Sequence, residues 1–158
     1  MVSDVQAIDR AIADYAFYLD TFQIEKVLEI WHDDAIFALT PIGEGILNSK
    51  KEIEVALREF FATVTQWAHT TGNRRIDMDG DEATATSHVH FNYIHRDGRR
   101  REGDGYWSDE WIRTESGWEM IFKTYLPLLT DNENLIRIAE AQRRGMAVHP
   151  LGADRPQV

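Results

Sequence analysis

The sequence of 158 residues contains no cysteine, which excludes disulfides, thiolate metal ligands and cysteine nucleophiles. Basic residues are also few: 17 Lys and Arg stand against 27 Asp and Glu, so the formal charge is −10 at pH 7. Because that charge repels polyanions, we expect no nucleic acid among the partners. Residues 96–101 form a local arginine cluster, which we interpret as the solvated tip of a hairpin.

Long hydrophobic runs are absent as well. No run approaches the roughly 20 apolar residues that span a membrane, and residues 1–10 lack the basic and apolar regions of a signal peptide. Gly-rich phosphate loops and the G-x-S-x-G and H-E-x-x-H motifs are missing too. We therefore expect a cytoplasmic protein with no membrane partner. Its length and 43% hydrophobic content suit a single domain over residues 1–158.

The first third of the sequence predicts helices. Ser3 and Gln6 form a capping box, and apolar residues follow at helical spacing. A second helix is expected over 24–31, then a short buried strand over 35–39, and a third helix after a second capping box that begins at Ser49. The apolar stripe of the first helix consists of Ile8, Ile12, Tyr15 and Leu19, and that of the third helix of Ile53, Leu57, Phe60, Phe61 and Val64.

The period of the pattern changes near residue 75. Alternating residues predict strands at 75–79, 82–94, 106–113 and 118–125, separated by turns, with Pro127 ending the last strand. A C-terminal helix over 132–144 and an irregular tail follow. Helices followed by an antiparallel meander predict an α+β fold, in which the helices pack on one face of a curved, mostly antiparallel sheet. Such a sheet encloses a cone, and the open end of a cone forms a small-molecule pocket.

Three charged or titratable residues stand out. Asp20 closes the first helix, where a carboxylate is badly placed for the helix dipole, so it either caps the second helix or has a function. His69 follows an apolar stretch and is either a hydrogen-bonded structural residue or a general base. Lys123 interrupts an apolar strand, and either reaches the rim of the cone or holds an anionic group inside it. On the preceding strand, Trp107 and Asp109 share one face.

His88 and His90 have the spacing of metal ligands on a strand. No third ligand completes a site, so we expect no metal, although a metal enzyme remains an alternative. We favour the arrangement in which Ser87, Val89 and the aromatic residues that follow face the cavity. The two histidines then face outward, toward solvent or another subunit.

The assembled pattern resembles the SnoaL-like branch of the NTF2-like superfamily, which has a cystatin-like fold. That superfamily includes scytalone dehydratase, ketosteroid isomerase and the hexachlorocyclohexane dehydrochlorinases. The resemblance extends over roughly residues 5–128. It rests on Tyr15 and Asp20, the runs 28–37, 69–73 and 79–83, Gly45, and Gly117 with Trp118.

The resemblance implies a small-molecule lyase or isomerase without cofactor or metal. His69 matches the position of the base and Asp20 that of its partner, while Lys123 stands where the dehydrochlorinases have an arginine. The implied reaction is proton abstraction followed by elimination, dehydration or isomerisation of a hydrophobic, cyclic substrate. Lys123, with Tyr93 or Tyr125, would stabilise the developing charge. The residues expected to line the substrate pocket are Tyr15, Phe37, Val89, Phe91, Tyr93, Trp107, Asp109 and Tyr125.

The alternative is a non-catalytic ligand-binding or assembly protein, like the small subunit of ring-hydroxylating dioxygenases. In that case Asp20 and His69 are structural. We also expect a homodimer or homotrimer formed through the outer face of the sheet. The reason is that Val89, Phe91, Trp107 and Trp111 exceed what the interior can hold.

Overall fold

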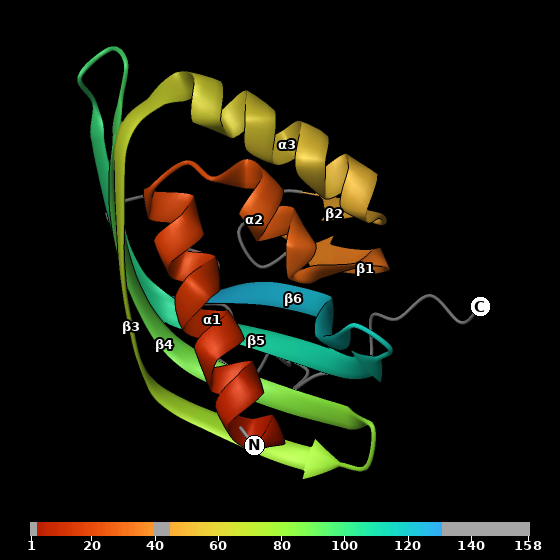
Figure 1. Ribbon diagram of the computed structural model, residues 1–158. Helices are drawn as coiled ribbons and strands as arrows, with labels where there is room; N and C mark the ends of the chain where they lie inside the picture. The colour runs from red at the N-terminus through yellow and green to blue at the C-terminus, as the bar shows by residue number, and fades with distance from the viewer. Residues whose placement is uncertain (1–2, 40–44, 131–158) are drawn as a thin grey trace.

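The computed structural model describes residues 3–39 and 45–130 (Figure 1). Helix α1 (Asp4–Asp20) begins at the predicted capping box: the Ser3 hydroxyl accepts from the Gln6 amide, and the Gln6 side chain accepts from the Ser3 amide. Helix α2 (Ile24–Glu29) is shorter than expected. At the start of α3 (Lys50–Thr63), Ser49 accepts from the Glu52 amide, but the Glu52 carboxylate binds the amide of Asn48, so the second box is incomplete.

Six strands form one sheet in the order β2-β1-β6-β5-β4-β3. The strands are β1 (Trp31–Ala38), β2 (Ile46–Leu47), β3 (Val64–Asp79), β4 (Glu82–His95), β5 (Arg100–Thr114) and β6 (Gly117–Thr130). Among these described strands, β1 and β6 pair parallel, and every other neighbouring pair is antiparallel. Figure 1 shows the three helices on the inner side of the sheet, which curves around α1. The predicted α+β fold with a curved, mostly antiparallel sheet is confirmed.

Strand β3 begins eleven residues earlier than the predicted strand at 75–79. Its register shifts between Val64 and Gln66 and again between Gly72 and Arg75, and Asn73 has a φ of 47°. Two such bulges break the period-2 pattern, so alternation could not be followed back to the true start. The consequence for function is that His69 lies within a strand, paired with Phe91 of β4.

Two other boundaries differ from expectation. Strand β1 already begins at Trp31 and includes Asp33 and Asp34, which were expected to precede it. Pro127 does not end β6: it lies opposite Gly105, next to a register shift, where a missing ladder N–H is tolerated. The strand predicted over 82–94 and its Asp97-Gly98 turn are confirmed, with Gly98 at a φ of 85°. The helix and tail predicted beyond residue 131 lie outside the described residues.

The core fills the space between α1 and the sheet. Ile8, Ile12, Tyr15 and Leu19 of α1 are buried, as the stripe predicts, against side chains from all the long strands. Val89, Trp107 and Trp111 are also buried there, and Phe91 packs against them. The premise that these four residues exceed the interior is therefore wrong, and the homo-oligomer stays a prediction without that support.

Candidate active site

Asp20 and His69 meet inside the cone. The Asp20 carboxylate makes two contacts with one residue: Oδ1 lies 2.5 Å from Nδ1 of the His69 ring, and Oδ2 accepts the His69 backbone N–H at 2.9 Å. Asp20 is the last residue of α1 and does not cap α2, whose N-cap position is occupied by Gln23. The helix end and the strand therefore hold the carboxylate and the imidazole in a fixed orientation.

The His69 ring is almost completely buried, with 2% of its side chain exposed. It packs near Trp67, Trp107 and Phe91, whose ring centroids lie 4.7, 5.4 and 6.3 Å from its own. Burial lowers the pKa of His69, while the hydrogen bond and charge of Asp20 oppose that shift and the positive charge of Lys123 adds to it. The net effect favours the neutral imidazole. Within the described part of the chain, its second nitrogen, Nε2, makes no hydrogen bond.

Lys123 lies deeper, in a fully buried ion pair. Its Nζ is 2.8 Å from Oδ1 of Asp109, and the two side chains are 1% and 0% exposed. The ammonium also lies 4.0 Å from the Trp107 ring centroid and 4.6 Å from that of Tyr15. Burial lowers the pKa of Lys123 and raises that of Asp109, and their mutual attraction opposes both shifts. The alternative of a lysine at the rim is therefore wrong.

Several buried polar atoms on the inner face have no partner in the described part of the chain. They include Ser87 Oγ, Asp109 Oδ2 and the Tyr125 hydroxyl. Ser87 and Tyr125 lie opposite Trp107 on the two neighbouring strands, and Asp109 is in the next inward-facing row. Since unpaired buried polar atoms are costly, their gathering on one face marks a place where a ligand can bind.

The predicted pocket residues form a connected aromatic wall. Tyr93 contacts Trp67 and Phe91, and Phe91 contacts Tyr125. Deeper in, Trp107 contacts Tyr15, which in turn contacts Trp31. Phe37 contacts the ring of Trp31 and pairs with Lys123 of β6, and Val89 is wholly buried in the sheet. Trp67, which belongs to the apolar stretch before His69, was not among the residues expected to line the pocket.

His88 and His90 face outward, as expected, on the other side of the sheet. Both bind Asp104 of β5: His88 Nε2 lies 3.2 Å from Oδ1, and His90 Nδ1 lies 3.0 Å from Oδ2. Each of the three side chains is between 28% and 39% exposed. Among the residues that the structure describes, no group of three or more His, Asp or Glu is arranged to hold a metal ion.

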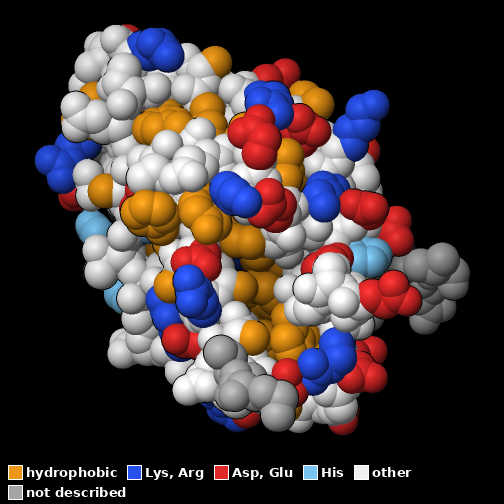
Figure 2. Space-filling model, in the orientation of Figure 1, with side chains coloured by type: hydrophobic (Ala, Val, Ile, Leu, Met, Phe, Trp, Pro, Cys, Tyr) orange, Lys and Arg blue, Asp and Glu red, His pale blue; other side chains and the backbone are white. Residues whose placement is uncertain are grey.

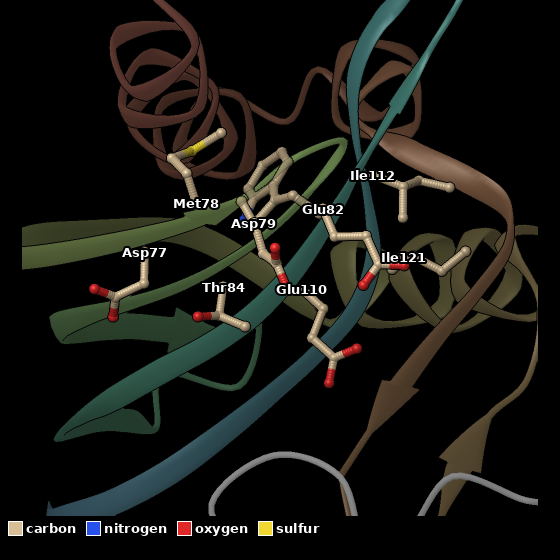
Figure 3. A pocket seen from close by; sticks show the side chains of 10 residues that line it. Asp77, Met78, Asp79, Glu82, Thr84, Glu110, Ile112 and Ile121 are labelled. Carbon is tan, nitrogen blue, oxygen red and sulfur yellow. The ribbon is translucent and has the colours of Figure 1, made fainter.

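A separate hollow lies at the other end of the sheet (Figure 3). Asp77 and Asp79 of β3, which line it, are eight and ten residues from His69, about 25 Å or more along an extended strand. Its lining carries four carboxylates and none of the predicted site residues. The ten lining residues are Asp77, Met78, Asp79, Glu82, Ala83, Thr84, Glu110, Trp111, Ile112 and Ile121.

Comparison with known proteins agrees with the fold. The model of the SnoaL-like domain family matches residues 1–123, and the chain belongs to that family. Comparison with curated proteins finds no match.

Among solved structures, the chain is similar to a protein of Novosphingobium aromaticivorans provisionally named an aromatic ring hydroxylase. The two share 28% identity over 82% of this chain and 94% of that one, with a TM-score of 0.76. A provisionally named scytalone dehydratase of the same organism is 19% identical, over 80% and 85% of the two chains, with a TM-score of 0.74. A hexachlorocyclohexane dehydrochlorinase is 17% identical, over 80% and 89%, with a TM-score of 0.68.

The surface adds two observations. Figure 2 shows hydrophobic side chains gathered in the middle of the viewed face, with charged side chains of both signs around them. No helix in the described ranges is both long and apolar enough to cross a membrane.

Proposed function

We propose that the protein is a small-molecule lyase or isomerase in which His69 abstracts a proton from the substrate. The observation that carries the proposal is the two-point contact of the Asp20 carboxylate with the ring and the backbone of His69. A carboxylate that accepts the Nδ1 proton fixes one tautomer of the imidazole and leaves a lone pair on Nε2. Members of the SnoaL-like and NTF2-like families are often lyases or isomerases, which is consistent with this role.

The step needs only groups of this chain. His69 Nε2 takes a proton from a carbon of the substrate, and the electron pair of the broken C–H bond either forms a C=C bond as a leaving group departs or moves onto a neighbouring carbonyl oxygen. The imidazolium that forms is stabilised by Asp20, which remains ionised. Lys123 does not bind the substrate directly, because its ammonium is paired with Asp109 and lies against the Trp107 ring.

The substrate that fits is hydrophobic and cyclic. The side chains around His69 are aromatic, so they exclude water and favour a flat apolar ring. Elimination of water or halide, or migration of a double bond, suits such a compound.

A second candidate is favoured by one observation. The 28% identical structure bears the provisional name of an aromatic ring hydroxylase. If this chain serves such an enzyme as a non-catalytic binding or assembly subunit, His69 with Asp20 is a structural contact.

The experiment is a screen of cyclic hydroxy, halo and enone compounds, followed by His69→Ala on any compound that is converted. We expect the rate to fall about 10²- to 10⁴-fold, because the general base is lost. Free imidazole, added to the variant, should restore part of the rate by occupying the space of the lost ring.

His88→Ala is the matched control, because that histidine also binds an aspartate but lies on the outer face. It should turn over the substrate at the wild-type rate. Conversion by His69→Ala at the wild-type rate would show that the base is elsewhere, whereas a screen in which no compound is converted would favour the second candidate.

A further inference from the structure

Two glycines of β5, Gly103 and Gly105, leave room for the ring of Tyr125. A Cβ atom at Gly105 would come within 2.5 Å of the Tyr125 ring and 2.4 Å of the Leu126 carbonyl oxygen. At Gly103 it would lie 2.8 Å from Cζ of Phe91 and 3.3 Å from the Tyr125 hydroxyl. The Tyr125 ring therefore lies against the backbone of Gly103 and Gly105, here called the glycine strip, where any larger residue would collide with it.

This strip brings the phenol toward His69. Tyr125 itself pairs with Trp107, but its hydroxyl reaches along β5 to the position of Gly103. Gly103 pairs with Phe91, and Phe91 pairs with His69. The hydroxyl thus lies in the same cross-strand row as His69, two strands away, which is roughly 10 Å between backbones.

Phe91 lies between the two groups on the same face of the sheet. Its ring centroid is 6.3 Å from that of His69 and 5.5 Å from that of Tyr125. A small molecule lying over Phe91 can contact the imidazole on one side and the phenol on the other.

The Tyr125 hydroxyl is a hydrogen-bond donor. It is buried and has no hydrogen-bond partner in the described part of the chain. Burial and the charge of Asp104 raise the pKa of Tyr125, so the phenol stays protonated. Lys123, by contrast, is engaged by Asp109 and by two aromatic rings. Of Tyr125 and Lys123, Tyr125 is therefore the one whose proton can be donated to a ligand.

We infer that Tyr125 donates the hydrogen bond that stabilises the substrate oxygen opposite His69, and that Gly103 and Gly105 position its phenol. This inference rests on the proposed function. When His69 removes a proton and the electron pair moves onto a carbonyl oxygen or a leaving oxygen, the negative charge forms beside the Tyr125 hydroxyl. The phenol strengthens its hydrogen bond to that oxygen, or transfers its proton to a departing one.

The probe for this role is 4-nitrophenol, an aromatic ring whose ionised oxygen mimics the developing charge and whose absorption band reports its ionisation. We expect the wild-type protein to bind the phenolate form in preference to the neutral form. Tyr125→Phe keeps the ring on the glycine strip and removes only the hydroxyl. It should weaken phenolate binding about 10- to 100-fold, the effect of a lost hydrogen bond to a charged group. Binding of neutral nitrobenzene should not change.

Gly103→Ala tests the positioning. Its added methyl group crowds Phe91 and the hydroxyl, so the bound probe should lose part of its preference for the ionised form while the far-ultraviolet circular dichroism is kept. Tyr106→Phe is the control, because Tyr106 lies beside His88 on the outer face, and it should bind the phenolate like the wild type.

Each result has a separate meaning. Phenolate binding that is equal in the wild type and in Tyr125→Phe, or absent from the wild type at millimolar probe, would overturn the role of Tyr125. Loss of turnover in His69→Ala would still support the proposed function in that case. The converse result is phenolate binding that weakens in Tyr125→Phe while His69→Ala turns over substrate at the wild-type rate. That result would support the role of Tyr125 and contradict the role of His69 as the base.

Discussion

At the scale of single residues, the site depends on the two oxygens of the Asp20 carboxylate. Asp20 accepts two N–H groups of His69, one from the ring and one from the backbone. Asn at this position has only one oxygen for these two donors. Its NH₂ group must face one of them, and a neutral imidazole then turns its Nδ1 lone pair toward the amide. The ring proton moves to Nε2, so the lone pair needed for catalysis is lost.

We therefore expect Asp20→Asn to lower kcat about 10²- to 10⁴-fold on a substrate found in the screen. The ¹⁵N shifts of the His69 ring should report the change of tautomer without any substrate. Asp14→Asn is the control, since Asp14 lies on the same helix beside Arg10, away from His69. A tautomer that is the same in Asp20→Asn and the wild type would contradict the role of Asp20.

The buried pair of Lys123 and Asp109 leads to a different residue-scale prediction. Lys123→Met leaves the Asp109 carboxylate buried without its partner, which should destabilise the protein by about 3–5 kcal/mol. In the double variant Lys123→Met/Asp109→Leu no buried charge remains, so much of that stability should return. The free energy of unfolding in urea measures both variants.

Lys26→Met, which removes an exposed lysine paired with Glu29, should leave the unfolding free energy nearly unchanged. A double variant as unstable as Lys123→Met would show that packing, rather than the uncompensated charge, sets the cost.

At the scale of elements, local signals predicted helix starts and turns well, and strand register poorly. The capping box of α1 and the Asp97-Gly98 turn depend on neighbouring residues only, and both are present. The pairing of Lys123 with Asp109 depends on a bulge. A count from the β5–β6 turn pairs Asp109 with Phe122, but the register shift between Glu110 and Trp111 moves Lys123 opposite Asp109. No pattern in the sequence marks that shift.

The candidate site was predictable only in part. Asp20 and His69 were assigned by family resemblance, and the structure brings them together because α1 ends beside the middle of β3. The sequence left Tyr93 and Tyr125 as equal candidates for stabilising the developing charge. The signal that could have found it is the Gly103-Asp104-Gly105 run, because glycines inside a strand mark a close approach of another group.

The N-terminus of α1 gives the element-scale prediction. Ser3 fixes the first turn, and the next residue, Asp4, binds Arg113 of β5 and the indole of Trp118 of β6. Ser3→Ala should lower the free energy of unfolding by about 1 kcal/mol, the usual effect of losing an N-cap. Ser3→Asp keeps an acceptor and should be close to the wild type. Urea denaturation compares the three proteins, and equal stability of Ser3→Ala and Ser3→Asp would show that the cap does not contribute.

At the scale of the whole molecule, folding places one histidine where it resists protonation. Burial lowers the pKa of His69 in the folded state, and Lys123 acts in the same direction, while Asp20 acts against both. In the unfolded chain the histidine titrates near its ordinary pKa of about 6.5. Below that pH the unfolded chain takes up a proton that the folded protein does not, which favours unfolding. The stability contributed by the neutral, buried His69 is therefore complete above about pH 6.5 and is lost as the pH falls.

We accordingly expect the free energy of unfolding to fall more steeply with decreasing pH in the wild type than in His69→Asn, whose amide can still donate to Asp20. The difference in slope can reach about 1.4 kcal/mol per pH unit, the value for one proton. Urea denaturation of both proteins between pH 7.5 and pH 4.5 measures it, and His88→Asn should keep the wild-type slope. Parallel profiles would mean that His69 titrates alike in both states. A wild type that gains stability relative to His69→Asn as the pH falls would mean that the charge of Asp20 outweighs burial, and that His69 is an imidazolium at rest and cannot begin the reaction as a base.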